Sequence, residues 1–101
     1  MKLNNSSSLK KLINKHKIIL SVYGLGNVGG PIAAAWLRKN AKIIGVDISK
    51  KLLNQIKEND SHKHEPFLSD IFSKSLSNGC LELTTDGIHA SKKSMIKIVA
   101  V

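Results

Sequence analysis

The most restrictive feature of the sequence is the stretch VYGLGNVGG, which joins an apolar, β-branched run to an alanine-rich segment. Its first three separated glycines, Gly24, Gly26 and Gly29, have the spacing G-x-G-x-x-G. Between a strand and a helix, such glycines permit a sharp turn, close approach of the backbone to a phosphate, and tight packing of helix on strand. The same spacing also occurs by chance, so the flanking sequence decides whether the loop binds a ligand.

The flanking sequence has the three features expected around a dinucleotide-binding loop. KIILSVYG, from Lys17, predicts a buried parallel strand, and IAAAWLRKN predicts the helix that follows the loop. KIIGVD predicts a second buried strand that ends at an acid, Asp47, 18 residues beyond Gly29. A spacing of about 20 residues is expected for the carboxylate that binds the adenosine ribose. Because this carboxylate would repel a 2′-phosphate, the sequence favours NAD over NADP.

We therefore predict an NAD site made by Asp47 and by residues 24–29, which we call the glycine loop. A helix that begins near Asn27 would direct its free N–H groups and the positive end of its dipole at the phosphates. The predicted cofactor-binding residues are Gly24, Leu25, Gly26, Asn27, Val28, Gly29 and Asp47. The alternative is a strand–turn–helix without a ligand, in which Asp47 only ends a strand.

The order of elements predicts an α/β fold. Strand, helix, strand, two helices, strand, short helix or turn, and strand alternate along the chain, which favours a Rossmann-type parallel sheet with flanking helices. The last strand, MIKIVAV, has no helix after it, so we expect the sheet to be truncated after about four strands, with one exposed face. We divide the chain into a basic flexible tail, residues 1–16, and the N-terminal part of a dinucleotide-binding domain, residues 17–101.

Composition argues against several other classes of protein. The net charge is +9, but residues 1–17 carry five lysines and no acid, so the predicted domain is only mildly basic and we expect no nucleic-acid partner. No apolar run approaches the roughly 20 residues that cross a membrane, so we expect no membrane partner. The single cysteine excludes an internal disulfide and fits the reducing cytoplasm.

The cysteine and two neighbouring histidines are interpreted as structural or surface residues and not as catalytic or metal-binding ones. Cys80 has no evident base beside it, so we interpret it as a structural thiol and assign no catalytic residue. His62 and His64 lack a third ligand, so we predict surface histidines and no metal site. Glu65-Pro66 is expected to begin a helix with an apolar stripe. That stripe comprises Phe67, Leu68, Ile71, Phe72 and Leu76, and core positions are also predicted for Trp36 and the alanines before it.

Four stretches in order, GLGNVGGPIAAAWLRKNAKIIGVDIS, EPFL, SNGCLELTTD and IKIVAV, resemble the N-terminal region of the UDP-glucose/GDP-mannose dehydrogenase family. Residues 17–101 are most similar to its UDP-N-acetyl-mannosamine dehydrogenases. The resemblance implies NAD-dependent oxidation of the C6 alcohol of a UDP-sugar to the carboxylate, by a cytoplasmic homo-oligomer in polysaccharide biosynthesis. Two loop positions depart from the family pattern: Asn27 replaces a usual tyrosine, and Gly30 replaces a common leucine.

The resemblance also implies that the catalytic cysteine and the sugar-nucleotide domain lie beyond Val101. The 101-residue chain alone is therefore predicted to be inactive, with a UDP-sugar as partner only in a full-length form. Two alternatives remain open. One is a truncated, non-catalytic nucleotide-binding fragment. The other is an NAD domain of the β-hydroxyacid dehydrogenase type, which shares the opening loop but often has Asn-Arg in place of Asp47-Ile48.

Overall fold

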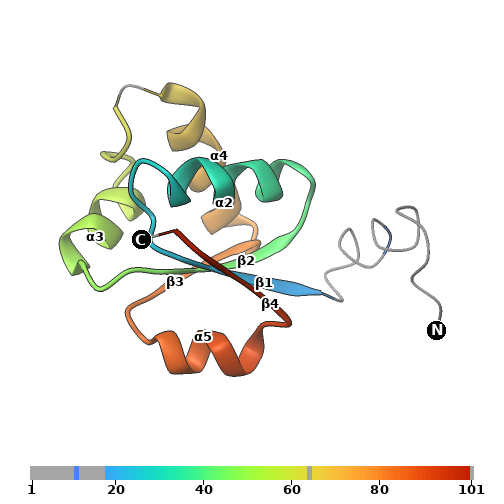
Figure 1. The fold of residues 1–101 in the computed structure, drawn as a ribbon. Coiled ribbons are helices and arrows are strands. Elements are labelled where there is room, and N and C mark those ends of the chain that lie inside the picture. The colour runs from blue at the N-terminus through green and yellow to red at the C-terminus, as the bar shows by residue number, and fades with distance from the viewer. Residues whose placement is uncertain (1–10, 12–17, 64, 101) are drawn as a thin grey trace.

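The computed structural model describes residues 11, 18–63 and 65–100. They form a four-stranded parallel sheet with strand order β3-β2-β1-β4 and helices on both faces (Figure 1). The strands are β1 (Ile19–Tyr23), β2 (Lys42–Val46), β3 (Leu81–Thr84) and β4 (Ile96–Val99). The helices are α2 (Gly29–Arg38), α3 (Lys50–Lys57), α4 (Pro66–Ser77) and α5 (Gly87–Lys93). The predicted α/β class and element order are confirmed.

The two strands at the centre of the sheet are apolar on both sides because helices cover both sides. β1 pairs with β2 and with β4, and Val22 faces Gly45 on one side and Ile98 on the other. Leu20 and Val22 belong to the core under α2 and α4, whereas Ile44 packs with Ala90 of α5 on the opposite face. Strands covered on both faces have near-continuous apolar runs, which is the pattern of KIIL and KIIGV.

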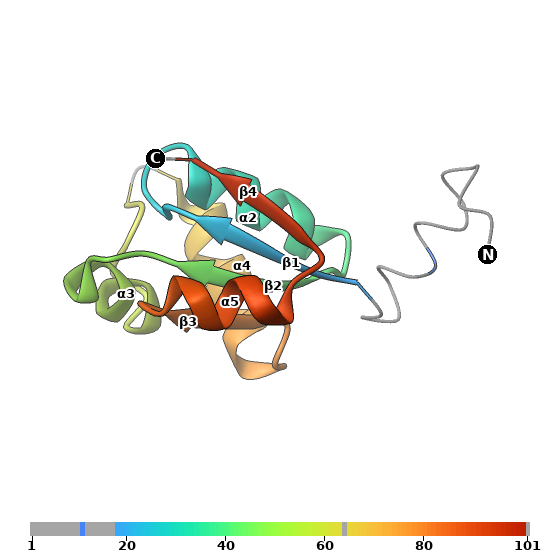
Figure 2. The same cartoon turned by 60° about the horizontal axis from the view of Figure 1, so that its bottom comes forward.

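The larger core lies between the sheet and helices α2 and α4, which Figure 2 shows on the side of the sheet away from α5. Helix α2 approaches the sheet through Ala33 and Ala34, since these small side chains are fully buried. Some predicted core positions were wrong or only partly right, and Ile71 and Leu76 are only partly buried. Ala35 is exposed on the outer side of α2, Trp36 is only partly buried, and Phe67, in the first turn of α4, is 79% exposed.

Local sequence explains where the helices begin. The Ser49 hydroxyl accepts a hydrogen bond from the N–H of Leu52 at 3.1 Å and caps α3, and the Asp86 carboxylate accepts from His89 and caps α5. Helix α4 begins at Pro66, as predicted from Glu65-Pro66, because a proline in the first turn loses no helical hydrogen bond.

Helix α5 packs on the face of the sheet opposite α2 and α4, where two polar contacts supplement its apolar contacts. The Tyr23 hydroxyl donates to the carbonyl of Gly87 at 2.9 Å. The hydroxyls of Ser21 and Ser94 are 2.8 Å apart, and both residues are buried, so each satisfies the other. These contacts tie the β1 strand to both ends of α5.

The β4 strand is an edge strand of the described sheet. Within the described residues it pairs only with β1, and Met95, Ile96 and Val99 are exposed. Ile98, in contrast, is partly buried against the larger core. The predicted flexible tail lies outside the described residues except for Lys11. Among the helices of the described part of the chain, none combines the length and apolar character needed to cross a membrane.

Candidate functional site

The candidate site lies at the carboxyl edge of the sheet, where β1, β2 and β4 end together. The Gly24 N–H donates to the carbonyl of Val46 at 2.7 Å, and the Ala100 N–H donates to the carbonyl of Tyr23 at 2.8 Å. These bonds bring the segments that follow the three strands to one place. Strand order reverses around β1, and in open α/β sheets ligands bind at the carboxyl ends of strands beside such a reversal.

Two glycines of the loop are required by the fold itself. Gly24 has a φ of 96°, in the left-handed region, so it makes the sharp turn out of β1 at no steric cost. A Cβ on Gly29 would lie 1.6 Å from the carbonyl oxygen of Gly24. No side chain can occupy that space, so the N-terminus of α2 rests directly on the turn.

Gly26 differs from its two neighbours in the motif. A Cβ placed on it would meet no atom of the described residues within 4 Å, and its φ lies outside the left-handed region. Gly26, Asn27 and Val28 are all exposed at the crest of the loop. Within the described chain, therefore, neither packing nor backbone conformation requires a glycine at position 26.

The Asp47 carboxylate faces the loop rather than bulk solvent. Its Oδ2 accepts from the N–H of Leu25 at 3.0 Å, and its Oδ1 accepts from the N–H of Ser49 at 2.9 Å. Leu25 is buried beneath the loop, where its side chain occupies the space that a Cβ on Gly45 would need. The structure thus brings Asp47 and the predicted loop residues together.

A small apolar hollow opens beside Asp47. It has a volume of about 160 Å³ and is lined by Tyr23, Gly24, Val46, Asp47 and Ile48. Ile48 is 93% exposed, although it is a large aliphatic residue. The hollow and the exposed isoleucine make an apolar wall next to a carboxylate.

The N-terminus of α2 follows directly on the glycine loop. Among the described residues, no side chain caps this helix and no acid lies in its first turn. Helices α3 and α5, in contrast, have their first N–H groups capped by Ser49 and Asp86. In the first turn of α2, the N–H groups of Gly30 and Ile32 donate to the carbonyls of Gly26 and Val28, and Pro31 has no N–H. The positive end of the helix dipole is therefore what would stabilise an anion near Asn27 and Val28.

One residue of this site was not found from the sequence. His62, from the connection between α3 and α4, lies against the glycine loop, with Nε2 3.0 Å from the carbonyl oxygen of Leu25 and 3.1 Å from that of Gly26. His62 is thus half-buried against the loop, so its predicted surface position was only partly right, while His64 lies outside the described residues. In the described part of the chain, no group of three metal-ligating side chains occurs.

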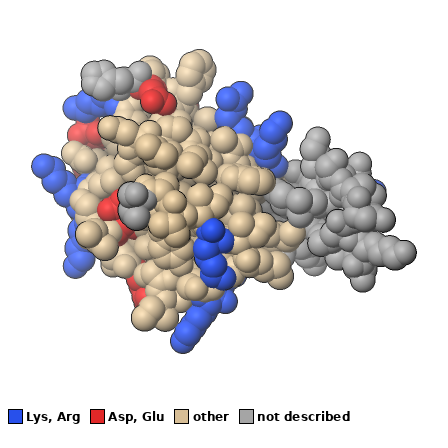
Figure 3. Space-filling model, in the orientation of Figure 1, with Lys and Arg blue, Asp and Glu red and all other residues tan. Residues whose placement is uncertain are grey.

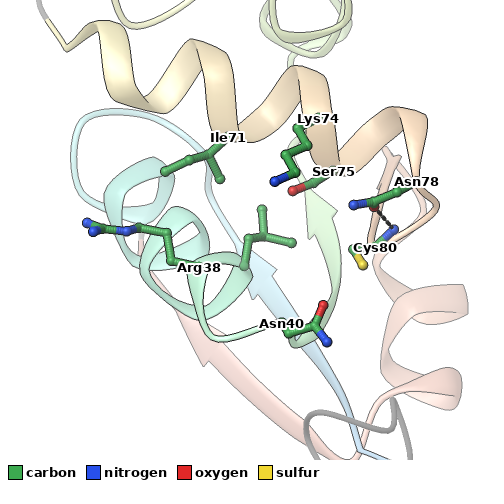
Figure 4. A pocket seen from close by; sticks show the side chains of 8 residues that line it. Arg38, Asn40, Ile71, Lys74, Ser75, Asn78 and Cys80 are labelled. Atoms are coloured by element: carbon green, nitrogen blue, oxygen red, sulfur yellow. Dashed lines mark hydrogen bonds between the residues drawn. The ribbon is translucent and has the colours of Figure 1, made fainter.

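A larger hollow lies at the other end of the sheet. It has a volume of about 330 Å³ and lies between the C-terminal ends of α2 and α4 (Figure 4). It is lined by Leu37, Arg38, Asn40, Ile71, Lys74, Ser75, Asn78 and Cys80. Cys80 is buried there, just before β3. Its thiol therefore lies at the amino edge of the sheet, whereas the glycine loop lies at the carboxyl edge.

Charged groups away from the loop are dispersed. For the described residues, Figure 3 shows lysine and arginine side chains at several places on one face, with acids near some of them and no single basic patch that covers the face. Glu82 of β3 pairs with His89 at 3.0 Å and Lys93 at 3.4 Å. Burial raises the pKa of Glu82, but the hydrogen bonds from His89 and Lys93 outweigh burial, so the pKa lies below its ordinary value. These pairs stabilise α5 on the sheet and are not part of the candidate site.

Comparison with known sequences gives a consistent set of relatives. The model of the UDP-glucose/GDP-mannose dehydrogenase family, NAD binding domain, matches residues 7–101. UDP-N-acetyl-D-mannosamine dehydrogenase of Salmonella typhi is 35% identical over 71 residues, which are 70% of this chain and 17% of that protein. GDP-mannose 6-dehydrogenase of Pseudomonas putida is 32% identical over 82 residues, or 81% of this chain and 19% of that protein.

Solved structures agree. GDP-mannose dehydrogenase from Pseudomonas aeruginosa superposes with a TM-score of 0.75 at 30% identity, covering 81% of this chain and 19% of that one. UDP-N-acetyl-mannosamine dehydrogenase from Staphylococcus aureus gives a TM-score of 0.70 at 28% identity, covering 82% and 19%. The chain therefore spans about one fifth of the length of the proteins it matches.

The close approach at Gly29 yields a stability prediction. Gly29→Ala places a methyl group on the Gly24 carbonyl, so the turn or the helix must move, and we expect a loss of at least about 2 kcal/mol in the free energy of unfolding. Urea unfolding followed by circular dichroism measures it. Gly26→Ala is the matched control, since its methyl group meets open space, and it should change the free energy of unfolding by less than about 0.5 kcal/mol. Equal stabilities of the two variants would contradict the packing described.

Proposed function

The chain belongs to the UDP-glucose/GDP-mannose dehydrogenase family and matches its NAD-binding domain, and from this premise we propose that the glycine loop and Asp47 are its cofactor site. The observation that supports this most is Gly26, a glycine that the fold does not require at the exposed crest of the loop. A ligand that must approach the backbone closely accounts for it. The pyrophosphate of NAD is such a ligand.

The geometry of the loop suits a diphosphate. Asn27 and Val28, which directly precede α2, would donate their N–H groups to the diphosphate, and the positive end of the helix dipole would stabilise its charge. Gly24 and Leu25 form the turn beneath, and Gly29 lets the helix lie close enough for its dipole to act on the ligand. The fold holds these groups in place before any ligand arrives.

The second strand supplies the contacts to the adenosine. Asp47 presents a carboxylate whose two oxygens already accept N–H donors of the protein, and each oxygen has further lone pairs for the ribose hydroxyls. Ile48 and the apolar hollow beside it offer a wall for the adenine ring. A carboxylate at this place disfavours a 2′-phosphate, which supports NAD over NADP.

The whole protein would oxidise a nucleotide sugar at C6. NAD⁺, when bound, accepts the hydride, while the residues of this chain bind and orient the dinucleotide. We favour a UDP-sugar, of the UDP-N-acetyl-mannosamine or UDP-glucose type, over a GDP-sugar. A relative that is 35% identical is named for UDP-N-acetyl-D-mannosamine, whereas the GDP-mannose 6-dehydrogenase is 32% identical. A homo-oligomer acting in the cytoplasm in polysaccharide synthesis fits this assignment.

The two alternative functions stand differently against this assignment. The family match argues against an NAD domain of the β-hydroxyacid dehydrogenase type. A nucleotide-binding fragment without catalysis describes the 101-residue chain itself, because Cys80, buried at the far edge of the sheet, cannot reach a substrate at the cofactor site. The binding function and the absence of turnover are therefore compatible in this chain.

The role of Gly26 can be tested by measuring both the NADH affinity and the thermal stability of two glycine variants. We expect Gly26→Ala to weaken NADH binding at least tenfold, about 1.4 kcal/mol, without lowering the melting temperature. Gly79→Ala is the matched control: Gly79 has a φ of 82° in the turn before β3, so the variant should be less stable yet bind NADH normally. Fluorescence titration and thermal unfolding give both quantities. Unchanged NADH affinity of Gly26→Ala would exclude a pyrophosphate at this position.

The charge of Asp47 can be tested by cofactor preference. Asp47→Asn keeps an oxygen that can accept from Leu25 or Ser49, but it removes the negative charge. Since hydrogen bonds to a charged group contribute about 1.5–3 kcal/mol, we expect NADH affinity to fall roughly tenfold and the preference over NADPH to shrink. Parallel titrations with NADH and NADPH measure it. An unchanged preference for NADH over NADPH would show that Asp47 does not contact the adenosine ribose.

The catalytic limit of the chain can be tested directly. The 101-residue chain should produce no NADH from NAD⁺ with UDP-N-acetyl-mannosamine, UDP-glucose or GDP-mannose, because its one thiol is buried at the opposite edge of the sheet. Absorbance at the NADH band follows the reaction, and a complete dehydrogenase of the family serves as the positive control. Turnover by the chain alone would overturn this assignment.

A further inference from the structure

His62 connects a polar segment between α3 and α4 to the glycine loop. Its Nε2 lies 3.0 Å from the carbonyl oxygen of Leu25 and 3.1 Å from that of Gly26, two consecutive carbonyls of the loop. We propose that His62 is a positioning residue that fixes the phosphate-binding conformation of this loop. The lack of a side chain at Gly30 provides the space that the His62 ring occupies. The proposal rests on the cofactor site proposed above.

The argument follows from the geometry of the peptide group. In a trans peptide the N–H points opposite to the C=O of the same unit. A donor that holds the carbonyls of Leu25 and Gly26 therefore turns the N–H groups of Gly26 and Asn27 away from His62. Gly26 O also accepts from the N–H of Gly30 at 3.0 Å, which fixes the same peptide unit from the helix side. His62 thus sets the direction of two amides of the proposed pyrophosphate site without touching the ligand.

The imidazole is itself held by its surroundings. Its ring packs edge-on against Phe72 of the core, with the ring centres 5.5 Å apart. Nδ1 lies 2.9 Å from the hydroxyl of Ser61, so a ring protonated at Nε2 can accept from Ser61 and donate to the loop. Ser69 donates to the Ser61 carbonyl at 3.1 Å, which ties the segment to α4. A fixed ring is what a positioning residue needs.

The backbone at His62 has an unusual conformation for a residue with a side chain. Its φ is 53°, in the left-handed region, and the His62 carbonyl accepts from the N–H of Glu65 at 2.9 Å. This conformation is unfavourable for residues other than glycine, and it persists only where surrounding contacts outweigh its cost. The contacts of the imidazole with the loop are such contacts.

Gly30 is the complement of His62. A Cβ on Gly30 would lie 2.5 Å from His62 Nε2, inside the volume of the ring. Position 30 lies in the first turn of α2, where glycine is otherwise unfavourable for the helix and no turn requires it. The two residues therefore depend on each other: a side chain at 30 would push the ring away from the two carbonyls.

The donor role is tested with two substitutions of similar size. His62→Gln can place an amide N–H near the position of Nε2, whereas His62→Leu fills the space without a donor. We expect His62→Leu to weaken NADH binding about fivefold and His62→Gln to stay within about twofold of the original chain. His89→Leu is the matched control, since His89 pairs with Glu82 on α5, and it should leave NADH affinity unchanged. Equal effects of Gln and Leu at position 62 would overturn the proposal.

The coupling of the two positions is tested by a double-mutant cycle. Gly30→Ala alone should weaken NADH binding about fivefold, by displacing the ring, and should weaken it less than twofold once His62→Ala has removed the ring. Additive effects would overturn the dependence of Gly30 on His62. If His62→Leu does not fold, as judged by circular dichroism, the cycle with Ala and the Gln variant carry the test.

The outcome also separates this proposal from the cofactor site itself. If the original chain binds no NADH, the proposed function fails. If the original chain binds NADH while the His62 and Gly30 variants bind it equally well, only the positioning role fails. Loss of affinity in His62→Leu with rescue by His62→Gln supports both.

Discussion

The structure depends on the contact between Gly29 and the carbonyl of Gly24. A Cβ on Gly29 would lie 1.6 Å from the Gly24 carbonyl oxygen, because the first turn of α2 lies directly on the turn that leaves β1. That contact fixes the direction of α2 across the sheet, so Ala33 and Ala34 meet the core and the uncapped N-terminus faces the crest of the loop. A side chain at position 29 would lift the helix and move both the core and the candidate site. Fold and site therefore share one steric constraint.

Around this contact, the loop is held by groups from three parts of the chain. The Asp47 carboxylate, at the end of β2, accepts from the N–H of Leu25, and the Gly30 N–H donates to Gly26 from within α2. His62 contacts the loop from the α3–α4 connection. A loop ordered in this way before a ligand arrives loses little conformational entropy on binding, so more of the contact free energy appears as affinity.

Sequence reasoning predicted the parts of the molecule that follow from periodicity and from chain conformation. Apolar runs gave the buried strands, and Gly24, Gly29 and Asp47 occupy the places their spacing predicted. The orientation of single side chains was harder, because Phe67 fits the apolar stripe of α4 but lies in its first turn, beyond the edge of the core. His62 was missed because its partners are backbone carbonyls 36 and 37 residues away, which no side-chain pattern marks. The available signal was Gly30, a second consecutive glycine that the loop motif does not need.

The position of β4 completes the strand reversal at which the cofactor site is proposed. β4 runs parallel to β1 on the side opposite β2, and Ala100 at its end donates to Tyr23 beside the glycine loop. In folds of this kind a dinucleotide crosses the sheet edge at the strand reversal, with one nucleotide on each side. The proposed adenosine side, with Asp47 and the apolar hollow, follows β1 and β2. In the proposed site, the nicotinamide side would lie toward β4, which is a short edge strand of the described sheet.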